Sequence, residues 1–185
     1  MTRIGIILGS TRPKRNGEQV ANWVYDMASQ RDDAEFELVD LRDYPLPHLD
    51  EPLPRQYQKE HTKKWADKIA SFDGFVFVTP EYNHSTSGVL KNAIDFLYTE
   101  WNNKAVGFVS YGGVGGTRAV EHLRLVVGEL QMADVRQQVA LSLRHEFEDF
   151  SILKPGEYSV QALHTLLDQV VAWSQALAPL RTAAA

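Results

Sequence analysis

The sequence predicts an α/β fold, a doubly wound parallel sheet of five strands with helices on both faces. Short apolar, β-rich runs alternate with longer segments of helical period, and this alternation is typical of parallel strands joined by helical crossovers. Three of the runs are almost continuously apolar, as strands covered on both faces usually are. The crossovers are expected to be right-handed. The five expected strands are residues 3–8, 36–41, 74–79, 105–110 and 135–141.

Between these runs, apolar residues recur at three- and four-residue spacing, which predicts amphipathic helices. The stripes lie within residues 20–27, 65–72, 90–97, 120–130 and 163–173. The stretch from Tyr44 to Pro54 holds four of the eight prolines. Because proline interrupts both helix and strand, this stretch is predicted to be a surface loop.

Composition limits what the chain can do. Its 185 residues are expected to form a single domain, residues 1–185, whose last eight or so residues are a loose tail. The net charge of −5 offers no general attraction to nucleic acid or anionic lipid, so any anion site must be local. There is no cysteine, which excludes thiolate chemistry. The N-terminal apolar run is too short for a signal peptide or a membrane span, so a cytoplasmic protein is expected.

The loop after the first expected strand has the residues of an anion site. It reads LGSTRPKRNG at residues 8–17 and leads into a helical segment. Ser10 and Thr11 offer hydroxyls, Arg12 and Arg15 offer guanidinium groups, and Gly17 lets the chain enter a helix whose free N–H groups face the loop. All of these favour a phosphate. The loop is neither a Walker A loop nor a G-x-G-x-x-G loop, and the alternative is a solvated turn with scattered basic residues.

Two more loops follow strands at the same edge, where ligands of such sheets bind. The stretch TPEYNHSTSGVLKNAIDFL, residues 79–97, places Tyr82 and a polar turn at the mouth of the sheet, where a flat amphipathic ligand would meet an aromatic face. Its alternative is a plain helix start with Ser85 or Ser87 as N-cap. The stretch SYGGVGGTRAVEHLR, residues 110–124, has four glycines within five positions. Glycines allow close approach of the backbone to a ligand, and a tight turn is the alternative.

Other chemistries lack their residue patterns. The six histidines include no His-x-x-x-His or His-Glu-x-x-His pair, so no metal site is expected. No serine stands in a Gly-x-Ser-x-Gly setting, which disfavours a triad hydrolase. The basic residues form no stripe interleaved with aromatic residues, which disfavours nucleic-acid binding. Without cysteine, a redox role would need a bound cofactor.

Taken together, the stretches GSTRPKRNGEQVANWV, TPEYNHSTSGVLKNAIDFL and SYGGVGGTRAVEHLR resemble the NAD(P)H-dependent FMN reductase family of flavodoxin-like proteins, which includes quinone, azo-dye and chromate reductases. The resemblance spans roughly residues 3–175 and implies a sheet of order 2-1-3-4-5 with one FMN per subunit. It places Ser10, Arg12, Arg15, Asn16 and Gly17 at the FMN phosphate, Pro80, Glu81, Tyr82 and Asn83 along the ring and ribityl chain, and Ser110, Tyr111, Gly112 and Gly113 at the other edge of the ring.

The resemblance also implies the activity. Hydride passes from NAD(P)H to FMN, the dinucleotide leaves, and a flavin, a quinone or a similar small-molecule acceptor takes its place in a ping-pong scheme. The chemistry lies at flavin N5, so no catalytic side chain is expected. The resemblance alone favours NADPH over NADH as the reductant. Two alternatives stay open. One is a flavodoxin-type electron carrier that binds FMN without oxidising NAD(P)H, and the other is a non-flavin binding protein on the same scaffold.

Two expectations concern assembly and local rigidity. Family members are commonly dimers or tetramers, so the resemblance implies a homodimer or homotetramer, with Tyr98 and Trp101 either at an interface or in the core. Members often carry proline where Ser87 stands. We therefore expect a looser start to the helix that follows Ser87.

Overall fold

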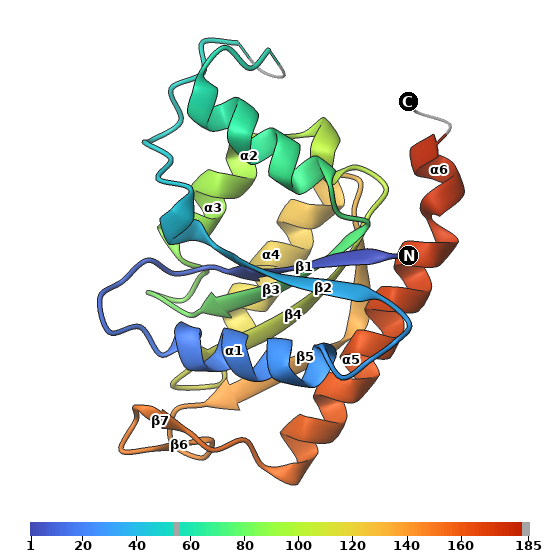
Figure 1. Cartoon of the computed structure of the whole chain (residues 1–185). Coiled ribbons are helices and arrows are strands. Elements are labelled where there is room, and N and C mark those ends of the chain that lie inside the picture. The colour runs from blue at the N-terminus through green and yellow to red at the C-terminus, as the bar shows by residue number, and fades with distance from the viewer. Residues whose placement is uncertain (54–55, 183–185) are drawn as a thin grey trace.

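The computed structural model describes residues 1–53 and 56–182; Pro54, the last residue of the expected proline-rich loop, lies outside the described residues. All five predicted strands form, and they pair as one parallel sheet of order 2-1-3-4-5, which confirms the predicted topology. The sheet twists through the centre of the molecule (Figure 1). Its strands are β1 (Arg3–Leu8), β2 (Glu35–Asp40), β3 (Gly74–Pro80), β4 (Ala105–Gly112) and β5 (Ala133–Ser142).

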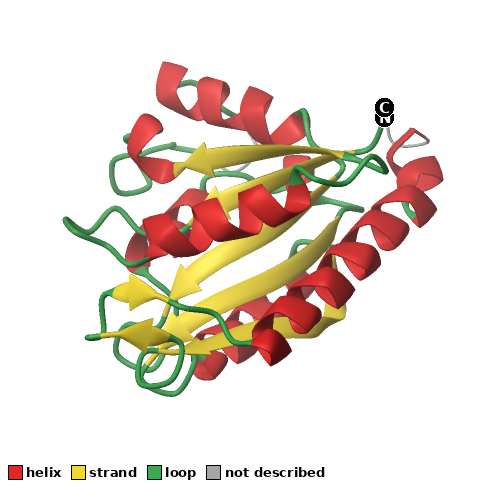
Figure 2. Cartoon of the chain, turned by 60° about the horizontal axis from the view of Figure 1, so that its bottom comes forward, coloured by secondary structure: helices red, strands yellow, loops and turns green. Residues whose placement is uncertain are grey.

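Five helices cover the sheet, and each forms at one of the predicted apolar stripes, three of which end one or two residues beyond their helices, at Phe72, Leu97 and Leu130. Two lie on one face and three on the other, so the sheet is the middle of three layers (Figure 2). Two short 3-10 turns, η1 (Leu41–Asp43) and η2 (Thr99–Trp101), follow β2 and the helix at residues 88–95. The first face carries α1 (Gly17–Ala28) and α5 (Glu157–Ala176), and the second carries α2 (Glu60–Ala70), α3 (Gly88–Asp95) and α4 (Thr117–Glu129).

The two cores follow from the alternation of side chains along each strand. In β1, Ile6 packs toward α1 and α5, whereas its neighbour Ile7 packs toward α2, α3 and α4. The second core is rich in aromatic rings, and Trp101 is fully buried in it, 5.0 Å between ring centroids from Phe75. Trp101 is therefore a core residue within the subunit. Tyr98 is half-buried, and its hydroxyl donates to the backbone oxygen of Glu129.

The chain order creates a crevice at one place in the sheet. The connection from β1 turns back through α1 to β2, and the chain then crosses to the other side of β1 to form β3, so β1 and β3 are neighbours whose following loops diverge. In open α/β sheets, ligands bind in this crevice outside the carboxyl ends of the strands. The loops after β1, β3 and β4 all reach this edge.

Two features differ from the sequence-based expectation. A small antiparallel hairpin, β6 (Phe147–Glu148) with β7 (Ile152–Leu153), lies beside the start of α1. The expected loose tail begins instead as a short helix, α6 (Ala178–Thr182), because Arg181 pairs with Asp73 at 2.8 Å and also donates to two backbone oxygens. Residues 183–185 lie outside the described residues. No helix in the described chain is long and apolar enough to cross a membrane.

Candidate functional site

The three loops at the carboxyl edge enclose a cavity of about 390 Å³, which we call the edge cavity. Its walls come from the loops after β1, β3 and β4, as the sequence predicted, and from the segment after β5. Among the predicted site residues, Ser10, Gly17, Asn83, Ser110 and Gly113 do not line it. The lining residues are Arg12, Pro13, Lys14, Arg15, Asn16, Pro80, Glu81, Tyr82, Tyr111, Gly112 and Leu143.

Hydrogen bonds hold the loop after β1 against β3 and against the loop that follows β3. The backbone N–H of Gly9 donates to the oxygen of Val78 at 2.8 Å, and the hydroxyls of Ser10 and Tyr82 lie 3.0 Å apart. The Arg12 side chain is exposed, and its guanidinium carbon lies 5.9 Å from the centre of the Tyr82 ring. Arg12 is therefore placed to meet an anion at the edge cavity, with the aromatic face of Tyr82 beside it.

Arg15 lines the edge cavity and is paired within the protein. Its side chain is buried and forms a two-pronged ion pair with Asp40, with one N···O distance of 2.8 Å, and it also donates to the backbone oxygen of Ser10. Burial raises the pKa of Asp40, but hydrogen bonds from Arg15 and from the backbone N–H of Arg42 outweigh this effect and hold the pKa below its ordinary value. The Arg15 guanidinium therefore already neutralises Asp40, and a contact of Arg15 with the FMN phosphate stays a prediction.

Asn16 is also partly committed within the protein. Its side-chain N–H donates to the backbone oxygen of Phe150 in the turn of the β6–β7 hairpin at 2.8 Å. Gln19, one turn further along α1, donates to Ser151 and accepts from the N–H of Leu153. These bonds fix the start of α1 to the hairpin. The free backbone N–H groups of this first turn, rather than the Asn16 amide, are the donors that α1 presents.

Tyr111 carries an orphaned polar atom beside this turn. Its side chain is about 95% buried at the end of β4, and within the described part of the chain its hydroxyl donates to no acceptor with hydrogen-bond geometry, while the Ser10 hydroxyl and the Gly17 backbone N–H lie beside its oxygen. The hydroxyl approaches Gly17 so closely that a Cβ there would collide with it. Burial raises the pKa of this hydroxyl, so it stays protonated and can donate. An unpaired buried donor next to a helix N-terminus fits a phosphate group.

The loop after β3 makes a tight turn with two residues in the left-handed region. Asn83 has φ of 49° and His84 has φ of 74°, and they connect Tyr82 to Ser85, whose backbones hydrogen-bond to each other. Non-glycine residues adopt such angles at a cost, and these residues cluster at functional sites. Asn83 is therefore held at the rim of the edge cavity without lining it.

This turn is also tied to α4. Glu81, which lines the edge cavity, forms an ion pair with Arg118 and accepts from the backbone N–H of Arg118 at 3.2 Å. Ser85 Oγ lies 2.9 Å from His122 Nδ1. Two successive turns of α4 thus hold the loop in place. The Glu81 carboxylate is matched by a cation and adds little repulsion toward a bound phosphate.

Ser87 corrects the expectation of a loose helix start. Its buried hydroxyl donates to the backbone oxygen of Gly9 and accepts from the N–H of Leu90 at 3.2 Å. It is the N-cap of α3, which was the alternative role considered for it. Because one hydroxyl caps the helix and joins the loops after β1 and β3, the start of α3 is well fixed.

In the glycine-rich loop after β4, some residues fix the shape of the loop and others leave its backbone accessible to a ligand. Ser110 is fully buried and donates to the backbone oxygen of Gly115 at 2.7 Å, so it fixes the shape of the loop and does not line the edge cavity. Its contact with the flavin ring stays a prediction. Gly115 and Gly116 have φ of 76° and 73°, which only glycine adopts readily. A side chain on Gly113 would meet open space, which leaves the backbone there accessible to a ligand.

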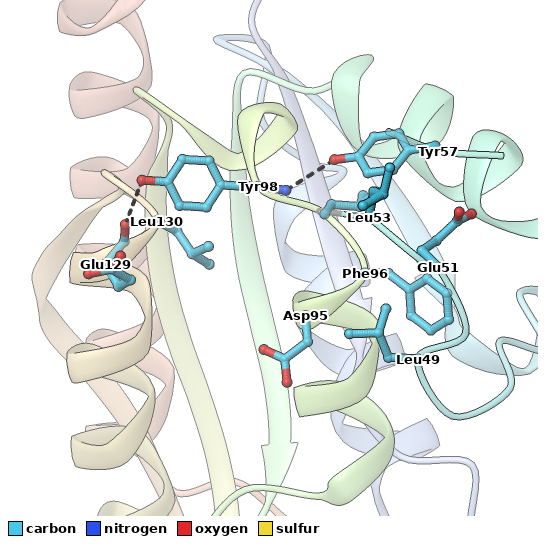
Figure 3. A pocket seen from close by; sticks show the side chains of 10 residues that line it. Leu49, Glu51, Leu53, Tyr57, Asp95, Phe96, Tyr98, Glu129 and Leu130 are labelled. Atoms are coloured by element: carbon cyan, nitrogen blue, oxygen red, sulfur yellow. Dashed lines mark hydrogen bonds between the residues drawn. The ribbon is translucent and has the colours of Figure 1, made fainter. Parts of the chain in front are cut away.

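A second cavity, of about 410 Å³, lies at the far ends of α3 and α4, away from these loops (Figure 3). Figure 3 shows Leu49, Leu53 and Phe96 on one side of it and Glu129 and Leu130 on the other. Its charged lining residues are carboxylates, which would repel a phosphate. The edge cavity is therefore the better candidate for an anionic cofactor. No group of three or more His, Cys, Asp or Glu residues in the described chain could hold a metal ion.

Sequence reasoning did not identify all residues of the site. It missed the contributions of Lys14 and Leu143 to the wall of the edge cavity, and it missed Asp40 as the partner of Arg15. Asp40 had a signal that could have been used, because it ends β2 at the same edge as the Arg15 loop. Leu143 had none, since it lies in an irregular segment after β5.

The fold is that of a flavodoxin-like protein, and the edge cavity is the candidate site for a flat cofactor that carries a phosphate. Comparison with known proteins agrees. The sequence profile of the family "NADPH-dependent FMN reductase" matches residues 2–146. An NAD(P)H-dependent FMN reductase of Schizosaccharomyces pombe is 47% identical over 146 residues, which are 76% of this chain and 73% of that protein. A 2-hydroxy-1,4-benzoquinone reductase of Burkholderia is 30% identical over 182 residues, 92% of this chain and 95% of that protein.

A structural relative supports the fold alone. The flavoenzyme FerB, an NAD(P)H:(acceptor) oxidoreductase of Paracoccus denitrificans, superimposes with a TM-score of 0.75 at 22% identity, covering 95% of this chain and 98% of that one. The chain belongs to the NADPH-dependent FMN reductase family. It is an oxidoreductase that uses FMN as cofactor and NAD(P)H as reductant.

Proposed function

We propose that the edge cavity is the FMN site and that electrons pass there from NAD(P)H to a small-molecule acceptor such as a flavin or a quinone. The observation that carries this proposal is the orphaned Tyr111 hydroxyl beside the first turn of α1, inside the cavity where the predicted loops meet. Exposed Arg12 supplies the positive charge that a phosphate needs.

The residues divide into two groups in this proposal. Ser10, Arg12, Tyr111 and the N–H groups at Gly17 hold the phosphate, and the segment Pro80–Asn83 with the backbone of Gly112 and Gly113 holds the ring. When bound, FMN supplies the hydride-accepting and hydride-donating chemistry. The chain itself binds and orients the reactants, with Tyr82 fixed by its hydrogen bond to Ser10. Backbone N–H groups of the glycine-rich loop stabilise negative charge at the ring edge.

The flavodoxin-type electron carrier is the less favoured function. The family profile and the curated relatives are reductases that use NAD(P)H. The Burkholderia relative, a benzoquinone reductase, supports a quinone as one acceptor for this chain. A second relative, an FMN-dependent NADPH-azoreductase of Staphylococcus aureus that is 31% identical over 159 residues, supports an azo compound as another. We also propose a cytoplasmic protein that assembles as a homodimer or homotetramer, which light scattering after size-exclusion chromatography would test.

An anaerobic titration tests the function. The protein reconstituted with FMN is titrated with NADPH and then with NADH while the visible absorbance of oxidised flavin is followed. Bleaching at about one equivalent of nicotinamide, followed by recovery on adding a quinone, is the expected result. Bound flavin that neither nucleotide bleaches would instead support an electron carrier, and failure to bind flavin would contradict both.

A further inference from the structure

A separate cavity of about 300 Å³ lies on the other side of the first loop. Thr11 lines this cavity, whereas the next residue, Arg12, lines the edge cavity, so a single turn of chain separates the two. We call it the side cavity. Its remaining walls come from the segment after β2 and from α3, and its lining residues are Thr11, Leu41, Arg42, Tyr44, Pro45, Leu46, Val89, Asn92 and Ala93.

Arg42 is the cation of the side cavity. Its guanidinium donates to the backbone oxygen of Arg12 at 2.9 Å and lies 4.0 Å from the Glu18 carboxylate, and about two-fifths of its side chain is exposed. A guanidinium has five N–H donors arranged as a fork. One short bond and one long ion pair hold the group in position and leave most of this fork for a ligand.

The neighbouring charges favour an anion at this position. Both oxygens of Asp40, two residues before Arg42, are taken by Arg15, and Oδ1 also accepts from the backbone N–H of Arg42. Lys64 Nζ lies 5.1 Å from the ring centre of Tyr44 and donates to the backbone oxygen of Asp43 at 3.4 Å. The acidic side chains that remain near are Glu18, Glu37 and Asp43, and Glu37 is already paired with Lys68. The cations near them are Arg42, Lys64 and Arg12.

The walls of the side cavity are largely apolar, in contrast to the charged groups around it. Tyr44, Leu46 and Val89 give it apolar sides, and Val89 is about 39% exposed. The polar side chain of Asn92 is already used, since it donates to Pro47 and accepts from Leu49. An apolar slot with a guanidinium at its rim suits a flat base attached to a phosphorylated sugar.

We propose that the side cavity binds the adenosine 2′-phosphate end of NADPH and that Arg42 recognises the 2′-phosphate. This inference rests on the proposed function, in which the nicotinamide end of the same molecule reaches the edge cavity across the turn at Thr11 and Arg12. NADPH differs from NADH only in this phosphate, so a residue that binds it sets the preference between the two. Arginine is the side chain best suited to a phosphate, because its fork can donate two parallel hydrogen bonds.

The test uses the FMN-bound protein and three variants, Arg42→Ala, Arg42→Lys and Arg136→Ala. Arg136 is an exposed arginine on β5, so its variant controls for the loss of one positive charge. We expect Arg42→Ala to raise the KM for NADPH roughly ten- to a hundredfold, the loss of a charge-assisted hydrogen bond, with kcat and the NADH parameters within about twofold. Arg42→Lys should recover part of the loss, and Arg136→Ala should behave as wild type.

A binding measurement separates the 2′-phosphate from the rest of the nucleotide. Calorimetric titration with 2′,5′-ADP and with 5′-AMP should show tighter binding of 2′,5′-ADP to the wild type, and Arg42→Ala should abolish the difference. Equal loss for both nucleotides, or an unchanged NADPH to NADH ratio, would overturn the assignment of Arg42. If neither NADPH nor NADH bleaches the flavin of the wild type, the proposed function itself is wrong. If both bleach it equally well, only the role of Arg42 in choosing NADPH is wrong.

Discussion

Arg15 and Asp40 form a buried ion pair that joins the loop after β1 to the end of β2. The pair is two-pronged, and the Arg15 side chain is almost fully enclosed whereas about a quarter of the Asp40 side chain is exposed. Arg15 also donates to the backbone oxygen of Ser10, so the same guanidinium shapes the loop that faces the edge cavity. The loop thus has a buried arginine that holds it in place and an exposed arginine, Arg12, that is free for a ligand.

The first prediction concerns this ion pair. Arg15→Met should lower the free energy of unfolding by about 2 to 4 kcal/mol, because it leaves the Asp40 carboxylate partly buried without its cation. The double variant Arg15→Met with Asp40→Leu should regain much of this loss, since no unpaired charge then remains. Urea denaturation at neutral pH measures both. A single variant as stable as the wild type would show that solvent compensates the Asp40 charge.

The pH dependence of the same pair has a definite sign. The pKa of Asp40 is lowered in the folded protein, so its contribution to stability is present above the ordinary carboxyl pKa and is lost as the pH falls through the lower folded value. The stability difference between wild type and Arg15→Met should therefore shrink in acid. A difference that stayed constant down to about pH 3 would assign the loss to packing rather than to charge.

The strands could be predicted because burial leaves a direct pattern in the sequence. Every residue of β3 and β4 is buried, and both appear as nearly continuous apolar runs. The boundaries were less certain. Strand β4 continues through Tyr111 and Gly112 because both pair with β5, a contact that the glycine-rich sequence does not indicate. The β6–β7 hairpin has two residues in each strand, which is too short for any period to show.

The side-chain roles were harder to predict than the site's location. The sequence shows that Arg12 and Arg15 are both basic, but only the fold shows that Asp40, twenty-five residues later, lies against one of them. The same holds for Ser87, whose hydroxyl reaches Gly9 from a loop seventy-eight residues away. Sequence identifies which loops meet at an edge. Which polar group each side chain then satisfies depends on tertiary contacts.

The second prediction concerns Lys104, at the opposite edge of the sheet. Its side chain is buried and its ammonium donates to the backbone oxygen of Ile69 at 2.8 Å. Burial, and next the positive charge of Arg181, lower the pKa of Lys104 from 10.5 to about 8. Above this value the folded protein has released a proton that the unfolded chain still holds, so Lys104 makes stability rise with pH.

We therefore expect the wild type to gain stability relative to Lys104→Met by about 2 kcal/mol between pH 7 and about pH 9.5. Urea denaturation of both proteins across this range measures the difference, and the subtraction removes groups common to both. Parallel curves for the two proteins would mean that Lys104 keeps its ordinary pKa.

The third prediction concerns the cofactor phosphate. Arg12→Ala should weaken FMN binding by roughly ten- to a hundredfold, because a hydrogen bond to a charged group contributes about 1.5 to 3 kcal/mol. Stability should change little, since the Arg12 side chain is exposed. Quenching of flavin fluorescence gives the affinity, and Arg136→Ala is the control for the loss of one charge. Equal FMN affinities of the wild type and Arg12→Ala would show that Arg12 does not bind the phosphate.

The fourth prediction separates stability from cofactor binding at one atom. Tyr111→Phe removes a buried hydroxyl that donates to no acceptor in the described chain, so the protein without FMN should gain about 1 to 2 kcal/mol of stability. If this hydroxyl donates to the FMN phosphate, the same change should weaken FMN binding several-fold. The two effects have opposite signs, which a merely structural tyrosine would not produce.

Tyr57 offers a matched control for this experiment. Its hydroxyl donates to Glu100 at 2.7 Å, far from the edge cavity, so Tyr57→Phe should lose stability and leave FMN affinity unchanged. Thermal unfolding without FMN and flavin titration are run on both variants. A Tyr111→Phe protein that loses stability would show that the hydroxyl is satisfied by solvent. A Tyr111→Phe protein that gains stability and keeps full FMN affinity would show that the FMN phosphate does not accept a hydrogen bond from the Tyr111 hydroxyl.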